Sequence, residues 1–301
     1  MRRLALALAL LLIAQVPGQA QSVYNAQSTY QKLLPQYPFI RIAGSTLAPG
    51  VVARKDITYA QRGTFALQLD LVLPKPGPLA PVLVLVHGGG WRSGDRQEFA
   101  ALAARLAERG YASAAVSYRL AGQALYPAAV DDVREAVRWV RAHAADYGID
   151  GRRIAIAGGS AGGQIASLVG VTGAGVQAII NIDGLSDFTS EEARKHEDDP
   201  AKKPSSAGAW FGGTYAEKSA LWREASPTFY VNAATPPILF IGSAQARFSV
   251  GREEMVAKLQ AAGVPNRVVK LPDSPHSFWM FDPWLQPTVE AMVAFLDERW
   301  R

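Results

Sequence analysis

Residues 154–163 read IAIAGGSAGG, an apolar run that passes directly into a glycine-rich turn around Ser160. A helix-compatible stretch, Gln164 to Val169, follows the turn. A hydroxyl at a sharp strand-to-helix turn needs small neighbours because the backbone there is strained, and the start of the helix favours developing negative charge. We therefore predict that Ser160 is a nucleophile. The alternative is a glycine-rich turn with an incidental serine.

A second glycine-rich stretch, His87-Gly88-Gly89-Gly90-Trp91, closes the apolar run at residues 82–86. In hydrolases with a nucleophile elbow, a loop in this position donates backbone N–H groups to the tetrahedral oxyanion. We expect Gly89 and Gly90 to be these donors, joined by the N–H of Ala161. His87 is expected to pack and hydrogen-bond within the loop and so to hold its shape.

One of four histidines must supply the general base for this serine. His87 belongs to the glycine loop, His143 to an amphipathic stretch and His196 to a run of charges. His276 lies in PDSPHSF, residues 272–278, after the last predicted strand, which matches the chain order serine, acid, histidine. We predict His276 as the base. The alternative is a surface-loop histidine.

Two aspartates compete for the role of the acid. The acid usually follows the strand at residues 238–241, but no carboxylate appears there before Glu253, and Gln245 stands about where an aspartate is expected. An amide can orient an imidazole but cannot stabilise imidazolium as a carboxylate does. Asp183 lies at the tip of the preceding strand and Asp187 follows it. We favour Asp183 for its position, although a turn-capping role fits it almost equally well.

Strands and helices alternate along most of the chain. Strands are predicted at residues 52–59, 65–73, 82–86, 112–118, 153–157, 176–182, 238–241 and 267–271, and helices near 96–109, 126–146, from 160, 251–262 and 287–301. The first two strands indicate an antiparallel hairpin, and the rest form a βαβ series. We predict an α/β fold with a mostly parallel, doubly wound sheet and an antiparallel N-terminal edge. Asp95 and Glu98 are interpreted as the capping box of the helix near 96–109.

Residues 1–20 have the pattern of a signal peptide cleaved after Ala20: two arginines, a short apolar run, and the small residues Gly18 and Ala20 at positions −3 and −1. The run is shorter than the roughly 20 residues that cross a bilayer. We expect export to the periplasm or the medium, with no membrane partner after cleavage. Residues 21–301 hold no linker or repeat and are predicted to form one domain. Residues 189–230 break the alternation and are interpreted as a lid insertion.

Composition argues against several classes of partner. The chain has no cysteine, so we expect neither disulfides nor a lipid-accepting thiol. Its net charge of +5 includes the arginines of the leader, and no Lys/Arg cluster stands out, so nucleic acid is not an expected partner. No metal-ligand cluster, P-loop or dinucleotide motif is present, so no metal and no cofactor are expected. The oligomeric state stays open.

Four motifs together resemble the secreted bacterial carboxylesterases of the α/β-hydrolase superfamily, near the acetylxylan, feruloyl and pectin acetyl esterase-like group. They are HGGGW at 87–91, SYRL at 117–120, GGSAGG at 158–163 and PHSFW at 275–279. The resemblance covers most of the chain from Val82 onward. It implies an α/β-hydrolase fold and hydrolysis of carboxylic esters through an acyl-enzyme, with acetyl or hydroxycinnamoyl groups on small molecules or polysaccharide as substrates. The missing aspartate after Gly242 departs from the commonest pattern of this superfamily.

Aromatic and basic residues near the motifs suggest how a substrate binds. Trp91 flanks the oxyanion glycines and Trp279 follows His276, and aromatic faces suit sugar rings or an aromatic acyl group. Packing in the core is the alternative for most such rings. Arg247 is a candidate to bind a substrate carboxylate, or else it forms ion pairs with nearby glutamates. Two other functions remain open: a peptidase or amidase on this fold, and a non-catalytic carbohydrate-binding relative.

Overall fold

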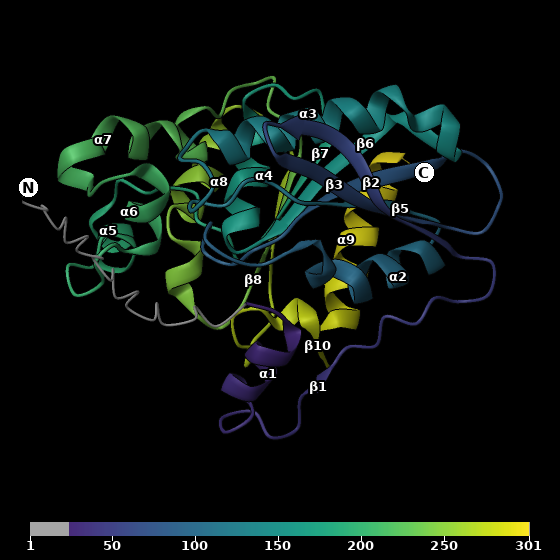
Figure 1. Ribbon diagram of the computed structural model, residues 1–301, viewed down its shortest axis with the longest axis horizontal. Coiled ribbons are helices and arrows are strands. Elements are labelled where there is room, and N and C mark those ends of the chain that lie inside the picture. Colours follow the sequence, from purple (N-terminus) through teal and green to yellow (C-terminus); the bar gives the residue numbers. More distant parts are fainter. Residues whose placement is uncertain (1–23, 301) are drawn as a thin grey trace, which may run out of the picture.

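The computed structural model describes residues 24–300, so the predicted signal peptide lies outside the described residues. Its main sheet has eight strands in the order β2-β3-β5-β4-β6-β7-β8-β9 (Figure 1). These strands are β2 (Val52–Arg62), β3 (Phe65–Leu73), β4 (Ala80–Val86), β5 (Ala112–Val116), β6 (Ile149–Gly159), β7 (Ala178–Ile182), β8 (Ile238–Gly242) and β9 (Asn266–Lys270).

The pairing of the strands confirms the predicted fold class. Strands β5, β4, β6, β7, β8 and β9 pair in parallel, whereas β2 and β3 pair antiparallel and form the N-terminal edge. Strand β4, inside the sheet, is apolar along its whole length because both faces of the sheet are covered, and every residue of β4 is buried. As a result the carboxyl ends of β4, β6, β7 and β8 meet at one edge of the sheet.

Helices cover both faces of the sheet. One face packs against α3, α4 and α8, and the other packs against α2 and α9, so two apolar cores flank the strands (Figure 1). Apart from the short helices of the insertion after β7, the helices are α1 (Ala26–Leu33), α2 (Ala100–Glu108), α3 (Ala128–Ala142), α4 (Ala161–Val171), α8 (Arg252–Ala261) and α9 (Leu285–Trp300). Among residues 24–300, no helix combines the length and apolar character that crossing a bilayer requires.

The insertion after β7 consists of α5 (Glu191–Glu197), α6 (Ser206–Phe211) and α7 (Tyr215–Glu224). These helices lie together at one end of the molecule (Figure 1). Trp210 and Trp222 are completely buried, and both rings contact Phe188 at the carboxyl side of β7. This aromatic cluster fixes the insertion onto the edge of the sheet where the carboxyl ends of the strands meet.

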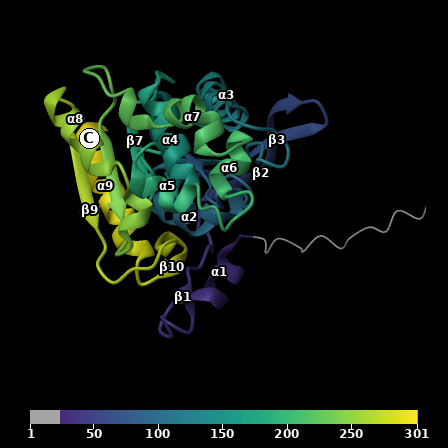
Figure 2. The same cartoon turned by 90° about the vertical axis from the view of Figure 1, so that its left-hand side faces the viewer.

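The N-terminal segment adds elements that the sequence patterns did not indicate. Strand β1 (Arg41–Ile42) pairs antiparallel with β10 (Phe281–Asp282), and α1 lies beside this small sheet (Figure 2). The Tyr24 hydroxyl is 2.9 Å from Ser277 Oγ, so the start of the described chain contacts the loop that carries His276. The described residues that precede β2, beginning at Tyr24, are therefore part of the site described next.

Candidate active site

Ser160 stands at the turn between β6 and α4 with φ 55° and ψ −123°. This conformation is rare for a residue with a side chain and is tolerated where surrounding contacts enforce it. Its N–H donates to Ile182 O at 2.8 Å. Glycines are required on both sides: a Cβ on Gly162 would lie 1.9 Å from Val86 O, and one on Gly159 would lie 2.4 Å from the Trp279 ring. The glycines therefore allow the tight turn that presents the Ser160 hydroxyl.

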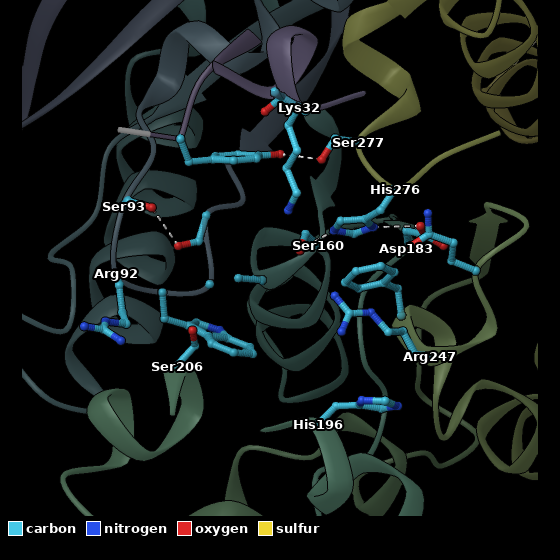
Figure 3. Close-up of a pocket in the computed structure, with 18 of the residues that line it drawn as sticks. Lys32, Arg92, Ser93, Ser160, Asp183, His196, Ser206, Arg247, His276 and Ser277 are labelled. Atoms are coloured by element: carbon cyan, nitrogen blue, oxygen red, sulfur yellow. Dashed lines mark hydrogen bonds and ion pairs between the residues drawn. The ribbon is translucent and has the colours of Figure 1, made fainter. Parts of the chain in front are cut away.

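Ser160, His276 and Asp183 form one chain of hydrogen bonds (Figure 3). The distance from Ser160 Oγ to His276 Nε2 is 2.8 Å, and the distance from His276 Nδ1 to Asp183 Oδ2 is also 2.8 Å. The Asp183 side chain is fully buried, and its other oxygen accepts the Ser243 N–H at 2.9 Å. This arrangement orients the imidazole with Nδ1 as donor and Nε2 as acceptor, which a base for the serine requires.

The other candidates for the acid have different partners. Asp187 Oδ1 accepts hydrogen bonds from the N–H and the hydroxyl of Thr189. Gln245 borders the cavity, and its own N–H donates to Ser243 Oγ. Because Asp183 occupies the Nδ1 side of His276, the structure brings together Asp183 and the histidine rather than Asp187 or Gln245.

The surroundings of His276 lower its pKa. Burial is the largest cause; the Asp183 carboxylate opposes it, and the positive charges of Arg247 and Lys32 reinforce it. The Phe248 ring stacks on the imidazole with centroids 3.4 Å apart and planes 7° from parallel. A histidine with a lowered pKa is neutral at physiological pH, and only a neutral imidazole accepts the serine proton.

The predicted oxyanion donors border the same cavity as Ser160. Gly89 and Gly90 adopt left-handed backbone with φ 103° and 60°, and the N–H groups of Arg92 and Ser93 donate to Gly89 O. Ala161 opens α4, so its N–H belongs to the first helical turn, whose N–H groups lack partners within the helix. Among the described residues, the Gly89 and Gly90 N–H groups donate no hydrogen bond to the protein. All three N–H groups are thus available to an oxyanion.

His87 holds the glycine loop, as predicted. Its ring is buried and stacks on Tyr118 at 4.3 Å, and its Nδ1 lies 2.9 Å from Gly88 O. The Tyr118 hydroxyl donates to His87 O. Burial lowers the pKa of His87 to about 4, so the ring is neutral at physiological pH.

Glu98 is a site residue that the sequence analysis missed. The capping-box interpretation was wrong for it: Asp95 caps the Gln97 N–H, while the Glu98 side chain points inward. Its two oxygens accept the Gly88 N–H at 2.8 Å and the Trp279 Nε1–H at 2.9 Å. Burial raises the pKa of this carboxyl to about 8. Glu98 therefore connects the glycine loop with the loop of His276, a contact for which the sequence carries no local signal.

The structure corrects the predicted role of one aromatic residue, Trp279, and places the other, Trp91, at the cavity. Trp279 is 1% exposed, does not line the cavity and donates its Nε1–H to Glu98. Trp91 borders the cavity but is only 4% exposed, and its ring packs on Trp210 and Phe188. Trp279 therefore belongs to the core and not to the cavity wall, whereas a substrate-binding role for Trp91 stays a prediction. Arg247, by contrast, lines the cavity.

The cavity in front of Ser160 has a volume of about 720 Å³. Its walls come from α1, the glycine loop, the insertion and the segment that follows β8. Within residues 24–300, no group of three or more histidine or acidic side chains is placed to hold a metal ion. The cavity is large enough for a ligand bigger than an acetyl ester of a simple alcohol.

The mostly parallel sheet, the strained serine between β6 and α4, and the hydrogen-bonded histidine and aspartate define the class of α/β-hydrolases with a Ser-His-Asp constellation. Comparison with known families identifies the particular one: residues 69–248 match the BD-FAE family model. The chain belongs to the BD-FAE family.

Relatives that are named esterases match this chain, and solved structures share its fold. Esterase LipQ and esterase LipC of Mycobacterium tuberculosis are 32% and 30% identical over 64% and 82% of this chain. The chain spans only 50% and 65% of their own lengths. A truncated carbohydrate esterase from gut microbiota, 22% identical, has the same fold with a TM-score of 0.71 over 84% of this chain and 98% of that one. Esterase 2 of Thermogutta terrifontis is 25% identical with a TM-score of 0.66, covering 83% and 94%.

Proposed function

We propose that this chain hydrolyses carboxylic esters through a covalent acyl-enzyme on Ser160. The observation that carries the proposal is the continuous hydrogen-bonded line from Ser160 Oγ through His276 to Asp183, at the mouth of a cavity that also borders Gly89, Gly90 and Ala161. Membership of the BD-FAE family and the esterase relatives support it.

In the proposed reaction, Ser160 Oγ attacks the ester carbonyl carbon while His276 Nε2 takes its proton. The N–H groups of Gly89, Gly90 and Ala161 stabilise the oxyanion that forms. His276 then gives the proton to the leaving alcohol, and the acyl group stays on Ser160. A water molecule, deprotonated by His276, attacks the acyl carbon; the bond to Ser160 Oγ then breaks, His276 returns the proton to Oγ, and the acid leaves. Asp183 stabilises the imidazolium in both halves of the cycle.

The proposed substrates are acetyl or feruloyl esters on plant cell-wall carbohydrate, met after export to the periplasm or the medium. The signal-peptide pattern of residues 1–20 supports export. A carbohydrate esterase with the same fold and the roomy cavity support a sugar-linked ester. Residues 189–230 would act as the lid over this substrate, because His196, Lys202 and Ser206 of this segment border the cavity.

Labelling of the protein with a fluorophosphonate, located by peptide mass spectrometry, tests the function together with turnover of 4-nitrophenyl acetate. We expect the label on Ser160 and a loss of turnover in Ser160→Ala by more than about 10⁴-fold. Ser45→Ala removes an exposed serine outside the cavity and should retain turnover. Faster cleavage of 4-nitroacetanilide than of the acetate would indicate an amidase. A folded protein that neither labels nor turns over ester would contradict the proposal.

A further inference from the structure

The cavity in front of Ser160 carries an excess of positive charge. Its lining includes four cationic side chains, from α1, the glycine loop, the insertion and the segment after β8: Lys32, Arg92, Lys202 and Arg247. The lining carboxylates are Asp183, which is bound to His276, and Glu197 on α5. Because Asp183 is bound to His276, Glu197 is the other lining carboxylate whose negative charge opposes the four positive charges.

Lys32 and Arg247 differ from the other cations of the cavity. Lys202 pairs with Asp199 at 3.2 Å, and Arg92 contacts Pro204 O. Within the described residues, neither Lys32 nor Arg247 lies within ion-pair distance of a carboxylate. Figure 3 shows both side chains reaching into the cavity from different walls, toward the space in front of Ser160. Two cations with no carboxylate within ion-pair distance among the described residues therefore face the same volume.

Arg247 is held in place by the aromatic stack behind it. Its guanidinium lies 4.1 Å from the centroid of the Phe248 ring, and that ring stacks on His276. A guanidinium fixed in this way keeps its N–H groups free for a carboxylate, which it binds with two parallel hydrogen bonds. Both Arg247 and Lys32 also act electrostatically on His276, which places their charges within reach of the reacting centre.

We propose that the cavity selects esters that carry a carboxylate, bound between Lys32 and Arg247, in preference to neutral esters of the same size. This inference rests on the proposed esterase function and names its substrate class. The carboxylate belongs either to the alcohol part, as in an acetylated uronic-acid saccharide, or to the acyl part, as in a half-ester of a dicarboxylic acid. Glu197, near Arg247, limits the strength of this selection.

Two matched pairs of esters separate these two sources of the carboxylate. In 4-acetoxybenzoate and its methyl ester the charge is on the alcohol side; in mono-4-nitrophenyl adipate and its methyl ester it is on the acyl side. The quantity measured is the ratio of kcat/KM for the anionic ester to that for the neutral one. Where the two esters of a pair differ in the reactivity of the leaving group, this difference is the same for every variant and cancels when the ratio is compared between variants.

The double variant Lys32→Gln/Arg247→Gln should lower the ratio by about tenfold or more for at least one pair, because two charge-assisted contacts are lost. The control Arg54→Gln/Lys55→Gln removes the same charge from the exposed edge strand β2 and should leave the ratio unchanged. Glu197→Gln should raise the ratio, and added salt should lower it in the wild type. Circular dichroism checks that each variant is folded.

An unchanged ratio in the Lys32/Arg247 variant, with both esters still hydrolysed, overturns the anion proposal and leaves the esterase function standing. Absence of hydrolysis of every ester by the wild type overturns the esterase function instead. Calorimetry with Ser160→Ala then decides the anion site by itself. Binding of 4-acetoxybenzoate that weakens about tenfold when Lys32 and Arg247 are also replaced supports it, and equal binding overturns it.

Discussion

Replacement of Asp183 distinguishes a catalytic acid from an aspartate that caps a turn. Asp183→Asn keeps the size of the side chain but removes the charge that stabilises imidazolium, and we expect kcat for an acetyl ester to fall by about 10⁴-fold. Asp187→Asn is the matched control, since Asp187 bonds only within its own turn in the described contacts, and it should lose less than about tenfold. Similar losses in the two variants would contradict the assignment.

Glu98 should act on catalysis through the two loops that it connects. In Glu98→Gln one of the two donors, Gly88 N–H or Trp279 Nε1–H, meets an amide NH₂ instead of an oxygen, which costs about 1–3 kcal/mol when buried. We expect lower kcat and lower unfolding free energy. Adding Trp279→Phe to this variant removes one of the two donors and should restore part of kcat and part of the unfolding free energy. Glu108→Gln, at an exposed site, should change neither.

At the level of single residues, the sequence predicted those that belong to a local pattern. Ser160 and the glycines around it sit in a strand-turn-helix motif, and His276 follows from chain order. The sequence favours Asp183 over Asp187 only for its place at the strand tip, because the contacts that distinguish them, with His276 and Ser243, come from distant parts of the chain. Glu98 and Trp279 pair across a long stretch of chain, and no periodicity records such a contact.

The segment after β8 is the element that sets the environment of the base. It supplies the Ser243 N–H to Asp183 and the Phe248 ring to His276, from the position where an acid usually stands. In this chain the aspartate that hydrogen-bonds to His276 lies at the end of β7, and the Ser243 N–H at the end of β8 supports it. The short helical turn Ala246–Ser249 thus supports His276 through the Phe248 ring, but it supplies no carboxylate.

Phe248→Ala should shift the pH dependence of hydrolysis. Burial is the main cause of the lowered pKa of His276, so removing the stacked ring raises that pKa toward its ordinary value, while Asp183, Arg247 and Lys32 still act on it. Because the neutral imidazole is the active form, the acid limb of the kcat/KM profile should move to higher pH. Phe248→Leu keeps most of the burial and should move it less. An unchanged limb in Phe248→Ala would contradict this role of the ring.

At the level of elements, buried strands and long helices were predicted well and short elements were not. Continuous apolar runs such as residues 82–86 indicate central strands whatever their partners. Helix α1 and the β1–β10 pair are short and are stabilised by contacts with the loop of His276. Their sequence alone therefore cannot be told from that of an ordinary polar loop. The part of α1 in the cavity wall follows from tertiary packing alone.

The stability of the whole molecule should depend on the charge of Glu98. Burial raises the pKa of this carboxyl from 4.5 to about 8, so the folded state holds more protons than the unfolded chain between these values. Its contribution to stability is complete below pH 4.5 and is lost as the pH rises to about 8. His87 acts in the opposite sense, because its lowered pKa removes stability as the pH falls from 6.5 toward about 4.

Urea unfolding at about pH 7.5 and about pH 9 isolates the effect of Glu98, since His87 is largely neutral in both states over this window. The wild type should lose unfolding free energy as the pH rises, and Glu98→Gln should lose less. The same slope in both proteins would show that another group dominates. Each pKa unit of difference between the two states corresponds to about 1.4 kcal/mol.

The described chain starts beside the cavity and ends away from it. Helix α1 contributes Lys32 and Leu33 to the cavity wall, whereas α9 ends near the opposite ends of the strands, where Trp300 contacts Tyr111 and Glu298 binds Arg267. An affinity tag or a tether to a resin therefore belongs after α9, because a tether at that end of the chain does not prevent a bulky polymer from reaching Ser160 as a substrate. The same addition ahead of α1 would sit beside the mouth, so a biocatalyst immobilised there should accept small esters and reject large ones.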